Sequence, residues 1–301
     1  MKNILVVYYS QTGQTKEIAQ NLVKPFQEKE QYNIDYYQIK PEKDYTFPWD
    51  GEDFYNAFPE SFQQIPIAIK KPEEKILNTD YDLVILAYQI WYLTPSIPVN
   101  SFLKSEFAEK IFNNKKVITV ISCRNMWAKA QVKMKTLLKN VNADLIGNIA
   151  FVDHAPNLIS VITISHWLMG GKKDRKYGIF PKPGVAEEDI KSASTFGEII
   201  LQTWENNDFQ NLQEKIIAAE GVYLKPFIIF MDEKANKMFQ IWSKFVLKNE
   251  KNRKLKLKFF KLYLLTALFV ISPLIFVIFF LTLPLRKKAL RKKRLNYYSV
   301  N

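Results

Sequence analysis

The sequence predicts an α/β fold, in which a doubly wound parallel sheet of five strands carries helices on both faces, followed by an apolar C-terminal segment. Short apolar runs alternate with amphipathic stretches over residues 1–205, and this alternation is typical of right-handed βαβ units. The apolar runs lack polar alternation, as in residues 3–9, which indicates strands buried on both faces of a sheet. A chain of 301 residues accommodates one such domain with appendages.

The strands and helices follow one another in regular order along this part of the chain. Strands are expected at residues 3–9, 33–39, 82–87, 116–122 and 145–153. Helices are expected at residues 14–30, 96–110, 126–140 and 187–204. Residues 41–80 are rich in aromatic side chains and are interrupted by Pro48, Pro59, Pro66 and Pro72, so no long element is expected there.

The remaining segments are predicted from their composition and position. Residues 155–186 are an insertion after the fifth strand, and an insertion of this length at a strand's carboxyl end is more often functional than structural. Residues 206–260 are predicted to be an amphipathic helical linker. Residues 261–285 are predicted to be a transmembrane or membrane-embedded helix, and residues 286–301 a basic tail.

The prediction of a membrane anchor depends on residues 262–285, a run of 24 residues without a charge. As a helix this run is about 36 Å long, enough for the ~30 Å hydrocarbon core of a bilayer. Pro273 is expected to kink it. Basic clusters flank it on both sides, so the positive-inside rule gives no orientation. A kinked hairpin within one leaflet and a buried core helix are the two alternatives.

The net charge of +13 is concentrated around this apolar run. Residues 244–301 contain 15 Lys or Arg and one acid, so residues 1–243 carry a formal charge of only −1. Nucleic-acid binders carry their basic patch on the folded domain, so this distribution argues against a nucleic-acid partner. It fits attraction to anionic lipid headgroups instead.

The single cysteine excludes an intrachain disulfide and fits a reducing compartment. The first residues pass directly into an apolar strand and lack a signal-peptide core with a cleavage site. We therefore expect the folded domain at the cytoplasmic face of the inner (plasma) membrane, held by its C-terminal anchor.

A loop rich in hydroxyl groups joins the first strand to the first helix, and it consists of Ser10, Gln11, Thr12, Gly13, Gln14 and Thr15. Hydroxyl groups, a close-approaching glycine backbone and the helix N-terminus can together bind a phosphate. No Lys or Arg falls within the loop, whereas nucleoside-triphosphate loops carry a Lys. The loop therefore favours one terminal phosphate monoester, and the alternative is an ordinary capped strand–helix turn.

Two stretches resemble the flavodoxin family. Residues 4–15 (ILVVYYSQTGQT) resemble its FMN-phosphate signature, and residues 81–99 (YDLVILAYQIWYLTPSIPV) resemble its second loop, where an aromatic residue packs beside the flavin ring. The resemblance covers about residues 1–205. It implies a flavodoxin-like fold with the strand order 2-1-3-4-5, which is known for flavodoxins, and FMN as the cofactor.

The flavin ring is expected outside the carboxyl ends of the strands, between loops 10–15, 88–95 and 122–127. Arg124 is a candidate electrostatic partner for the N1/C2=O edge of the reduced ring, with a solvated salt bridge as the alternative. For the aromatic candidates the alternative to stacking on the flavin is packing between helix and sheet. For Asn125 the alternative to a hydrogen bond with the ring is capping of the next helix. The ring-site candidates are Tyr88, Gln89, Trp91, Tyr92, Ser122, Arg124 and Asn125.

Histidine and cysteine chemistry is limited in this sequence. His154 follows the fifth strand and is a candidate for moving a proton near the flavin edge, with packing or capping as the alternative. His166 is expected to pack, and Cys123 to be an inert buried thiol because no His or Lys neighbours it in sequence. The spacing of these residues indicates no metal site.

Four segments resemble bacterial flavodoxin-like proteins known as dialkylresorcinol condensing enzymes of aryl-polyene and flexirubin-type pigment pathways. They are residues 1–14, 123–127 (CRNMW), 157–164 (NLISVITI) and 178–184 (GIFPKPG). Condensation of acyl units needs a cysteine nucleophile with a histidine base, and the sequence supplies no such pair. The resemblance with a flavin site implies an FMN-dependent oxidation of a dialkylcyclohexanedione to a dialkylresorcinol, with a ketosynthase as partner.

The predicted function is therefore that of a membrane-anchored FMN-dependent oxidoreductase with a lipophilic substrate. An NAD(P)H:quinone-type flavin reductase is one alternative. A membrane-tethered electron-transfer or scaffold protein is another.

Overall fold

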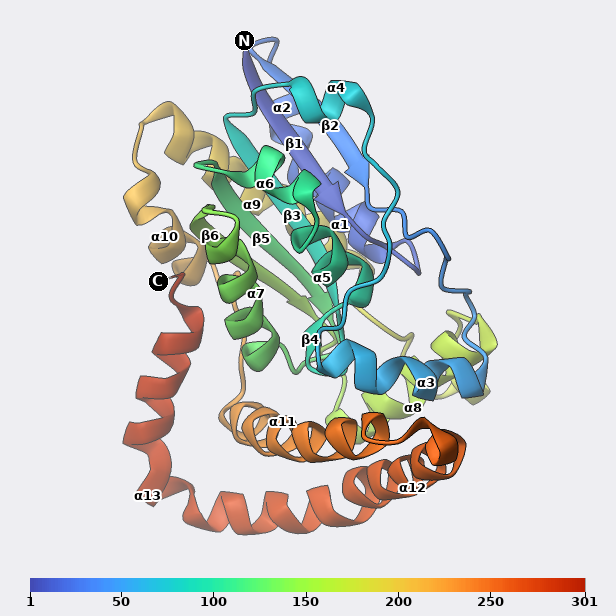
Figure 1. Ribbon diagram of the computed structural model, residues 1–301. Helices are drawn as coiled ribbons and strands as arrows, with labels where there is room; N and C mark the ends of the chain where they lie inside the picture. Colours follow the sequence, from blue (N-terminus) through green and yellow to red (C-terminus); the bar gives the residue numbers. More distant parts are fainter. Residues whose placement is uncertain (301) are drawn as a thin grey trace.

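A computed structural model describes residues 1–300 and has a parallel sheet at its centre with helices on both faces (Figure 1). The strands are β1 (Lys2–Tyr8), β2 (Tyr32–Gln38), β3 (Leu83–Trp91), β4 (Thr94–Pro95), β5 (Lys116–Cys123) and β6 (Asp144–Val152). Their order is β2-β1-β3-β5-β6, and the two-residue β4 pairs antiparallel with β3. Counting only the long strands gives 2-1-3-4-5, so the predicted fold class and order are confirmed. The short β4 was not predicted.

Helices connect the strands and continue beyond them. Up to residue 205 they are α1 (Gln14–Leu22), α2 (Lys24–Gln27), α3 (Gly51–Phe62), α4 (Glu74–Asn78), α5 (Ile97–Leu103), α6 (Glu106–Phe112), α7 (Ala128–Asn140), α8 (Asn157–Gly170) and α9 (Glu187–Glu205). Beyond it they are α10 (Leu212–Ala218), α11 (Pro226–Leu247), α12 (Arg253–Thr266) and α13 (Ser272–Tyr298). Short 3₁₀ turns lie at Lys176–Gly178, Phe209–Asn211 and Glu250–Asn252.

Four expected elements differ from those observed. The helix expected at residues 96–110 is divided into α5 and α6. The helix expected at residues 14–30 is divided into α1 and α2, and Pro25 lies in the first turn of α2. Residues 41–80 contain the 12-residue helix α3 despite Pro59, because Asp50 caps it by accepting a hydrogen bond from the Glu52 backbone N–H. The insertion contains α8, which was not predicted as a helix.

Both faces of the sheet are buried, as the continuous apolar runs predicted. Along β1, Ile4 and Val6 pack in one core cluster and Leu5 and Val7 in the other, and all four side chains have no exposed surface. Successive residues of a strand point to opposite faces, so each face has its own hydrophobic layer.

Helix α1, which begins at the hydroxyl-rich loop, is held closely against α9. An ideal β-carbon at Gly197 of α9 would lie 2.0 Å from the carbonyl oxygen of Leu22, so only glycine permits this approach. The close packing fixes the direction of α1 relative to the sheet.

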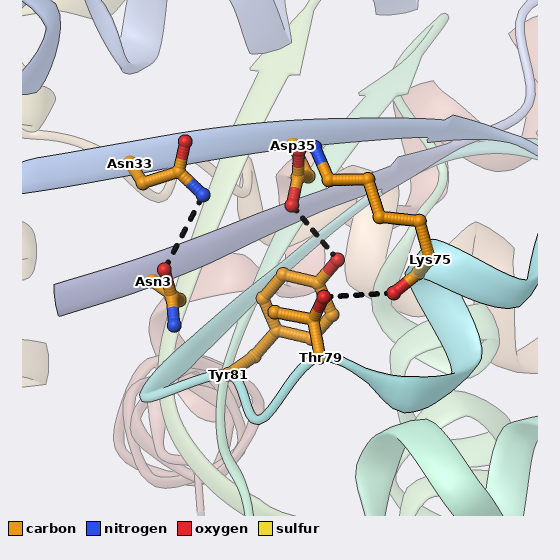
Figure 2. A network of polar contacts seen from close by, with 6 residues as sticks. All are labelled: Asn3, Asn33, Asp35, Lys75, Thr79 and Tyr81. Carbon is orange, nitrogen blue, oxygen red and sulfur yellow. Dashed lines mark hydrogen bonds and ion pairs between the residues drawn. The ribbon is translucent and has the colours of Figure 1, made fainter. Parts of the chain in front are cut away.

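A polar network joins β1, β2, α4 and the segment that leads into β3 (Figure 2). Asp35 on β2 accepts a hydrogen bond from the Tyr81 hydroxyl at 3.1 Å and forms an ion pair with Lys75 of α4. Asn33 donates to Asn3 across the β1–β2 pair. These contacts set the register of β1, β2 and the segment that leads into β3.

The C-terminal helices pass beneath the carboxyl ends of the strands (Figure 1). Residues Glu250–Tyr298 form one helical run of 49 residues that is long and apolar enough to cross a membrane. A π-helical turn at Ala267–Ile271 precedes Pro273, which lacks the N–H that would bond to the carbonyl of residue 269. The distortion expected at Pro273 is therefore a π-helical turn directly before it. Helix α13 contains a second proline, Pro284, for which no kink was predicted.

Candidate functional site

The three predicted loops meet at the carboxyl ends of the strands around a cavity of about 250 Å³. Of the predicted residues, those that line it are Gln11, Thr12, Gln14, Gln89, Trp91, Tyr92, Ser122 and Arg124. Lining residues that were not predicted as ligands are Trp49, Phe54, Ile90, Cys123, Ile164, Trp167, Leu168, Gly184 and Val185. The second group comes mainly from residues 41–80 and from the insertion. The aromatic residues of these two segments are the sequence feature that could have indicated a role in the cavity.

The hydroxyl-rich loop contains buried polar atoms that lack partners. Ser10 Oγ and Thr15 Oγ1 are buried and form no hydrogen bond within residues 1–300. Gly13, at the N-cap of α1, has a φ of +89°, a conformation that strains other residues. A phosphate group would accept hydrogen bonds from these hydroxyls and from the free N–H groups of α1. The loop therefore fits the terminal phosphate of FMN.

The side chains of Gln11 and Gln14 are committed to other loops. Gln11 donates to the Thr46 carbonyl at 2.9 Å and accepts from Trp49 Nε1 at 2.9 Å. Gln14 donates to the Val185 carbonyl at 2.8 Å and accepts from its N–H. These side chains therefore fasten the loops on either side of the phosphate loop, and the expected role of Gln11 and Gln14 in cofactor binding stays a prediction.

An aromatic cluster forms one wall of the cavity. The rings of Trp49 and Trp91 have centroids 5.2 Å apart at 74°, and Tyr45 lies 4.9 Å from Trp91. The Tyr92 hydroxyl donates to the Phe54 carbonyl, which joins the β3 loop to α3. Flat aromatic faces of this kind bind conjugated rings well.

Strand alternation separates two neighbouring candidates, Tyr88 and Gln89. Tyr88 is fully buried in the core and donates to Gln131 Oε1 at 2.6 Å, so its expected stacking on the flavin is wrong. Gln89 lines the cavity, and its Oε1 is buried without a partner within residues 1–300. A hydrogen-bond donor on a bound ring would satisfy this oxygen.

Arg124 lies at the inner end of the cavity. Its Nη1 donates to the carbonyl and to Oδ1 of Asn157 at 3.1 and 2.7 Å, and its Nη2 lies 3.9 Å from Met126 Sδ. No carboxylate within residues 1–300 forms an ion pair with it. Burial lowers its pKa to about 10, partly offset by Asp153, so it remains a cation at neutral pH. A cation in this setting favours a ligand atom that carries negative charge.

A second cavity, of about 550 Å³ and mostly apolar, adjoins the first. It extends between α3, α8, α11 and the C-terminal helices, and Leu264, Leu268 and Ile271 form part of its outer wall. Residues that line both cavities are Phe54, Ile90, Tyr92, Cys123, Arg124 and Ile164. Arg124 is thus the charged group among the residues that line both the phosphate-loop cavity and the apolar cavity.

His154 lies elsewhere than expected. It lines a third cavity, of about 550 Å³, with Tyr223 and the first turns of α13, and it is absent from the lining of the phosphate-loop cavity. Its side chain is half exposed, and Nε2 lies 3.5 Å from Asp189 Oδ2. The structure does not support the expected proton transfer to or from a flavin, because the end of β6 faces α11 and α13 here.

Asn125 also turns away from the phosphate-loop cavity. Its Nδ2 donates to Asn157 Oδ1 at 3.1 Å, and the residue lines the second and third cavities. Burial raises the pKa of the Cys123 thiol well above its ordinary value, in line with the expected inert thiol. His166 Nε2 lies 2.8 Å from Asp174 Oδ1.

Sequence reasoning missed one buried acid near the site, Asp232 of α11. Its side chain has no exposed surface, and Oδ2 accepts a hydrogen bond from the Lys129 N–H at 3.2 Å, in the first turn of α7. Burial raises the pKa of Asp232 to about 7. The carboxyl thus fastens α11 beneath the loop that carries Arg124.

We expect Asp232→Asn to remove a pH dependence of stability. The folded-state pKa exceeds the unfolded value near 4, so the folded chain retains a proton that the unfolded chain loses. The free energy of unfolding should therefore fall as pH rises from about 4 to 7, by up to about 4 kcal/mol from this group. Urea unfolding of both proteins at a series of pH values measures the difference.

The control for this experiment is Glu233→Gln, which changes the neighbouring carboxylate and its ion pair with Lys293. In a chain that carries Glu233→Gln, Asp232→Asn should still remove the pH dependence of stability, because burial is the main cause of the raised pKa of Asp232. Parallel stability profiles for wild type and Asp232→Asn would contradict a raised pKa.

Residues 3–143 match the family model described as Flavodoxin. Together with the sheet order, this match shows that the N-terminal part of the chain has a flavodoxin-like fold. No curated protein matches the chain.

The solved structures that are similar to the chain include the following three. A flavoprotein from Lactobacillus acidophilus in complex with FMN is 18% identical, with 50% of this chain and 93% of that chain covered and a TM-score of 0.39. Oxidised flavodoxin 1 from Bacillus cereus is 16% identical, with 65% of this chain and 95% of that chain covered and a TM-score of 0.34. A flavone reductase is 11% identical, with 68% of this chain and 64% of that chain covered and a TM-score of 0.36.

Proposed function

We propose that the protein is a membrane-associated, FMN-dependent oxidoreductase that acts on a lipophilic substrate. One observation carries the proposal: the cavity beside the phosphate loop and the larger apolar cavity share a boundary at Arg124. The outer wall of the apolar cavity belongs to the C-terminal helical run, the part of the chain apolar enough to contact lipid.

The residues beside the phosphate loop would hold FMN. Ser10 and Thr15 would donate hydrogen bonds to its phosphate, and Trp49 and Trp91 provide aromatic surface for its ring. Bound there, FMN supplies a two-electron acceptor or donor next to the apolar cavity. Gln11 and Gln14 hold the surrounding loops in place around the ring site.

The apolar cavity would bind the substrate. Its volume and its aromatic and aliphatic lining suit long alkyl groups. Arg124 is the charged group that this cavity shares with the cavity beside the phosphate loop, and it would stabilise negative charge that develops on a substrate oxygen or on the reduced ring. A substrate with an acidic or enolisable oxygen and alkyl tails satisfies both parts of the site.

The specific reaction that we propose is aromatisation of a dialkylcyclohexanedione to a dialkylresorcinol. The dione would enolise with its oxygen facing Arg124, and aromatisation would then release a hydride, for which bound FMN would be the two-electron acceptor, and a proton to the solvent. A ketosynthase would supply the dione, and the alkyl tails would keep it in the cytoplasmic leaflet of the inner membrane.

A reductase for membrane quinones is the second candidate, because the apolar cavity would admit a quinone head and its isoprenoid tail. In that reaction Arg124 would stabilise the quinol anion. The two candidates differ in the reductant that each requires, and a scaffold protein would require none.

The test uses the purified full-length protein reconstituted with FMN in lipid under anaerobic conditions. The proposal expects visible flavin absorbance that is bleached by the dione alone, with formation of one resorcinol per flavin by mass spectrometry. Bleaching by NAD(P)H but not by the dione would favour the quinone reductase. A protein that shows no flavin absorbance after FMN is added would contradict both.

A further inference from the structure

The C-terminal helical run, residues 253–298, is fastened to the flavodoxin-like domain at its first end. Arg253 Nη2 donates to Glu60 Oε2 at 2.7 Å and to the Asn56 carbonyl at 2.8 Å, and both partners lie on α3. The rings of Phe58 and Phe260 stack with centroids 3.7 Å apart at 7°. This end is therefore bound by a charge-assisted hydrogen bond and by aromatic packing.

The same run is fastened at its last end. The Tyr297 hydroxyl donates to Glu233 Oε1 at 3.1 Å, and the Tyr298 hydroxyl accepts from the Leu224 N–H at 3.1 Å. Tyr298 also stacks on Trp127 at 6.5 Å and 13°, directly after the loop that contains Arg124. Both ends of the apolar segment thus contact one folded domain.

The middle of the run lies along α11 and exposes its other side. Phe279 is buried, and its ring centroid lies 5.4 Å from that of Phe227 on α11. The outward side chains are 55–88% exposed and include Leu262, Val270, Leu274, Ile278, Leu281 and Leu285. Water-soluble proteins rarely expose a continuous apolar surface of this extent, and such a surface marks a site of contact with lipid or with another protein.

Basic side chains border this surface at both ends. Lys258 precedes it, and Lys287, Lys288, Arg291 and Lys292 follow it, all without ion pairs among residues 1–300. An apolar surface bordered by cations matches the acyl boundary and the anionic headgroups of a bilayer. A protein partner would have to be both apolar and strongly acidic at two separate places.

We propose that residues 253–298 lie in the surface of one leaflet and do not cross the bilayer. A crossing segment would place its ends on opposite sides of a ~30 Å hydrocarbon core, and one set of the contacts above would be lost. In-plane binding keeps both sets and places both basic clusters at the same headgroup layer. The inference rests on the membrane association proposed above, and it holds for any reaction at the flavin site.

The test labels single cysteines in membrane vesicles from cells that produce the full chain. Lys258→Cys and Lys292→Cys place a thiol at each end, and Ile278→Cys places one on the outward apolar face. A membrane-impermeant maleimide is applied to right-side-out and to inverted vesicles. The unaltered chain, in which the partly buried Cys123 is the single cysteine, is the control.

We expect the two end positions to react in the same vesicle orientation and to lose labelling in the other orientation, while Ile278→Cys reacts only after detergent. Reaction of the two ends in opposite orientations would overturn in-plane binding and leave membrane association standing. Full reaction of Ile278→Cys without detergent would overturn membrane association itself.

A cross-linking experiment tests the last end directly. Glu233→Cys with Lys293→Cys replaces an ion pair of 2.6 Å, and a short bismaleimide should join the two thiols within membranes. Glu52→Cys with Lys293→Cys is the matched control, because Glu52 pairs with Lys254 at the other end of the run. Equal cross-linking of the two pairs, or none in either, would overturn the proposed attachment of the last end.

Discussion

The double variant Ser10→Ala/Thr15→Val should bind FMN about 10²- to 10⁴-fold more weakly than wild type. Each hydroxyl is buried and has no hydrogen-bond partner within the described residues 1–300, so each is free to donate a hydrogen bond to a phosphate oxygen. A hydrogen bond to a charged group contributes about 1.5–3 kcal/mol, and about 1.4 kcal/mol corresponds to a tenfold change in affinity. Titration of flavin fluorescence quenching measures the loss.

Riboflavin, which lacks the phosphate, is the ligand control and should bind the double variant and wild type almost equally. Thr203→Val is the protein control, because Thr203 is a buried threonine of α9 that donates to the Ile199 carbonyl. It should leave FMN affinity unchanged. If the double variant weakened riboflavin and FMN to the same extent, the loop would not be the phosphate site.

Arg124→Leu should lower turnover of the dione by about 10²- to 10³-fold while FMN remains bound. The guanidinium is the cation at the boundary of the two cavities, and removal of one group that stabilises developing negative charge typically has this effect. Arg124→Lys should recover part of the activity because it restores the charge without the planar fork. Single-turnover flavin reduction separates the chemical step from substrate binding.

The reduction potential of the bound flavin, measured without substrate, identifies the partner of Arg124. A lower potential in Arg124→Leu would show that the cation stabilises the reduced ring. An unchanged potential with slower turnover would assign it to the substrate oxygen. Turnover within threefold of wild type would contradict a role for Arg124 in the reaction.

The sheet and the phosphate loop could be predicted from sequence because their signals are local. A buried strand, a hydroxyl-rich turn and a helix follow one another within the first 22 residues, and each leaves its own pattern. Tyr88 could have been assigned correctly too. The two-residue period of β3 places Tyr88 and Gln89 on opposite faces, and the aromatic character of Tyr88 outweighed that pattern in the prediction.

Other features of the site depend on contacts between distant segments. Gln11 and Gln14 bind backbone atoms of residues 46 and 185, and neither partner can be inferred from the loop itself. His154 was expected beside the flavin because it ends a strand, yet α11 and α13 decide which cavity that strand end faces. The apolar segment predicts lipid contact, which stays a prediction, and its length and charge carry no information about where its ends dock.

The apolar helical wall of the second cavity has a consequence for kinetics. If Leu264, Leu268 and Ile271 separate the substrate from the acyl chains of a leaflet, the substrate approaches by lateral diffusion in two dimensions. The reaction velocity would then follow the mole fraction of substrate among the lipids, and dilution of the membrane with inert lipid would slow it at constant bulk concentration.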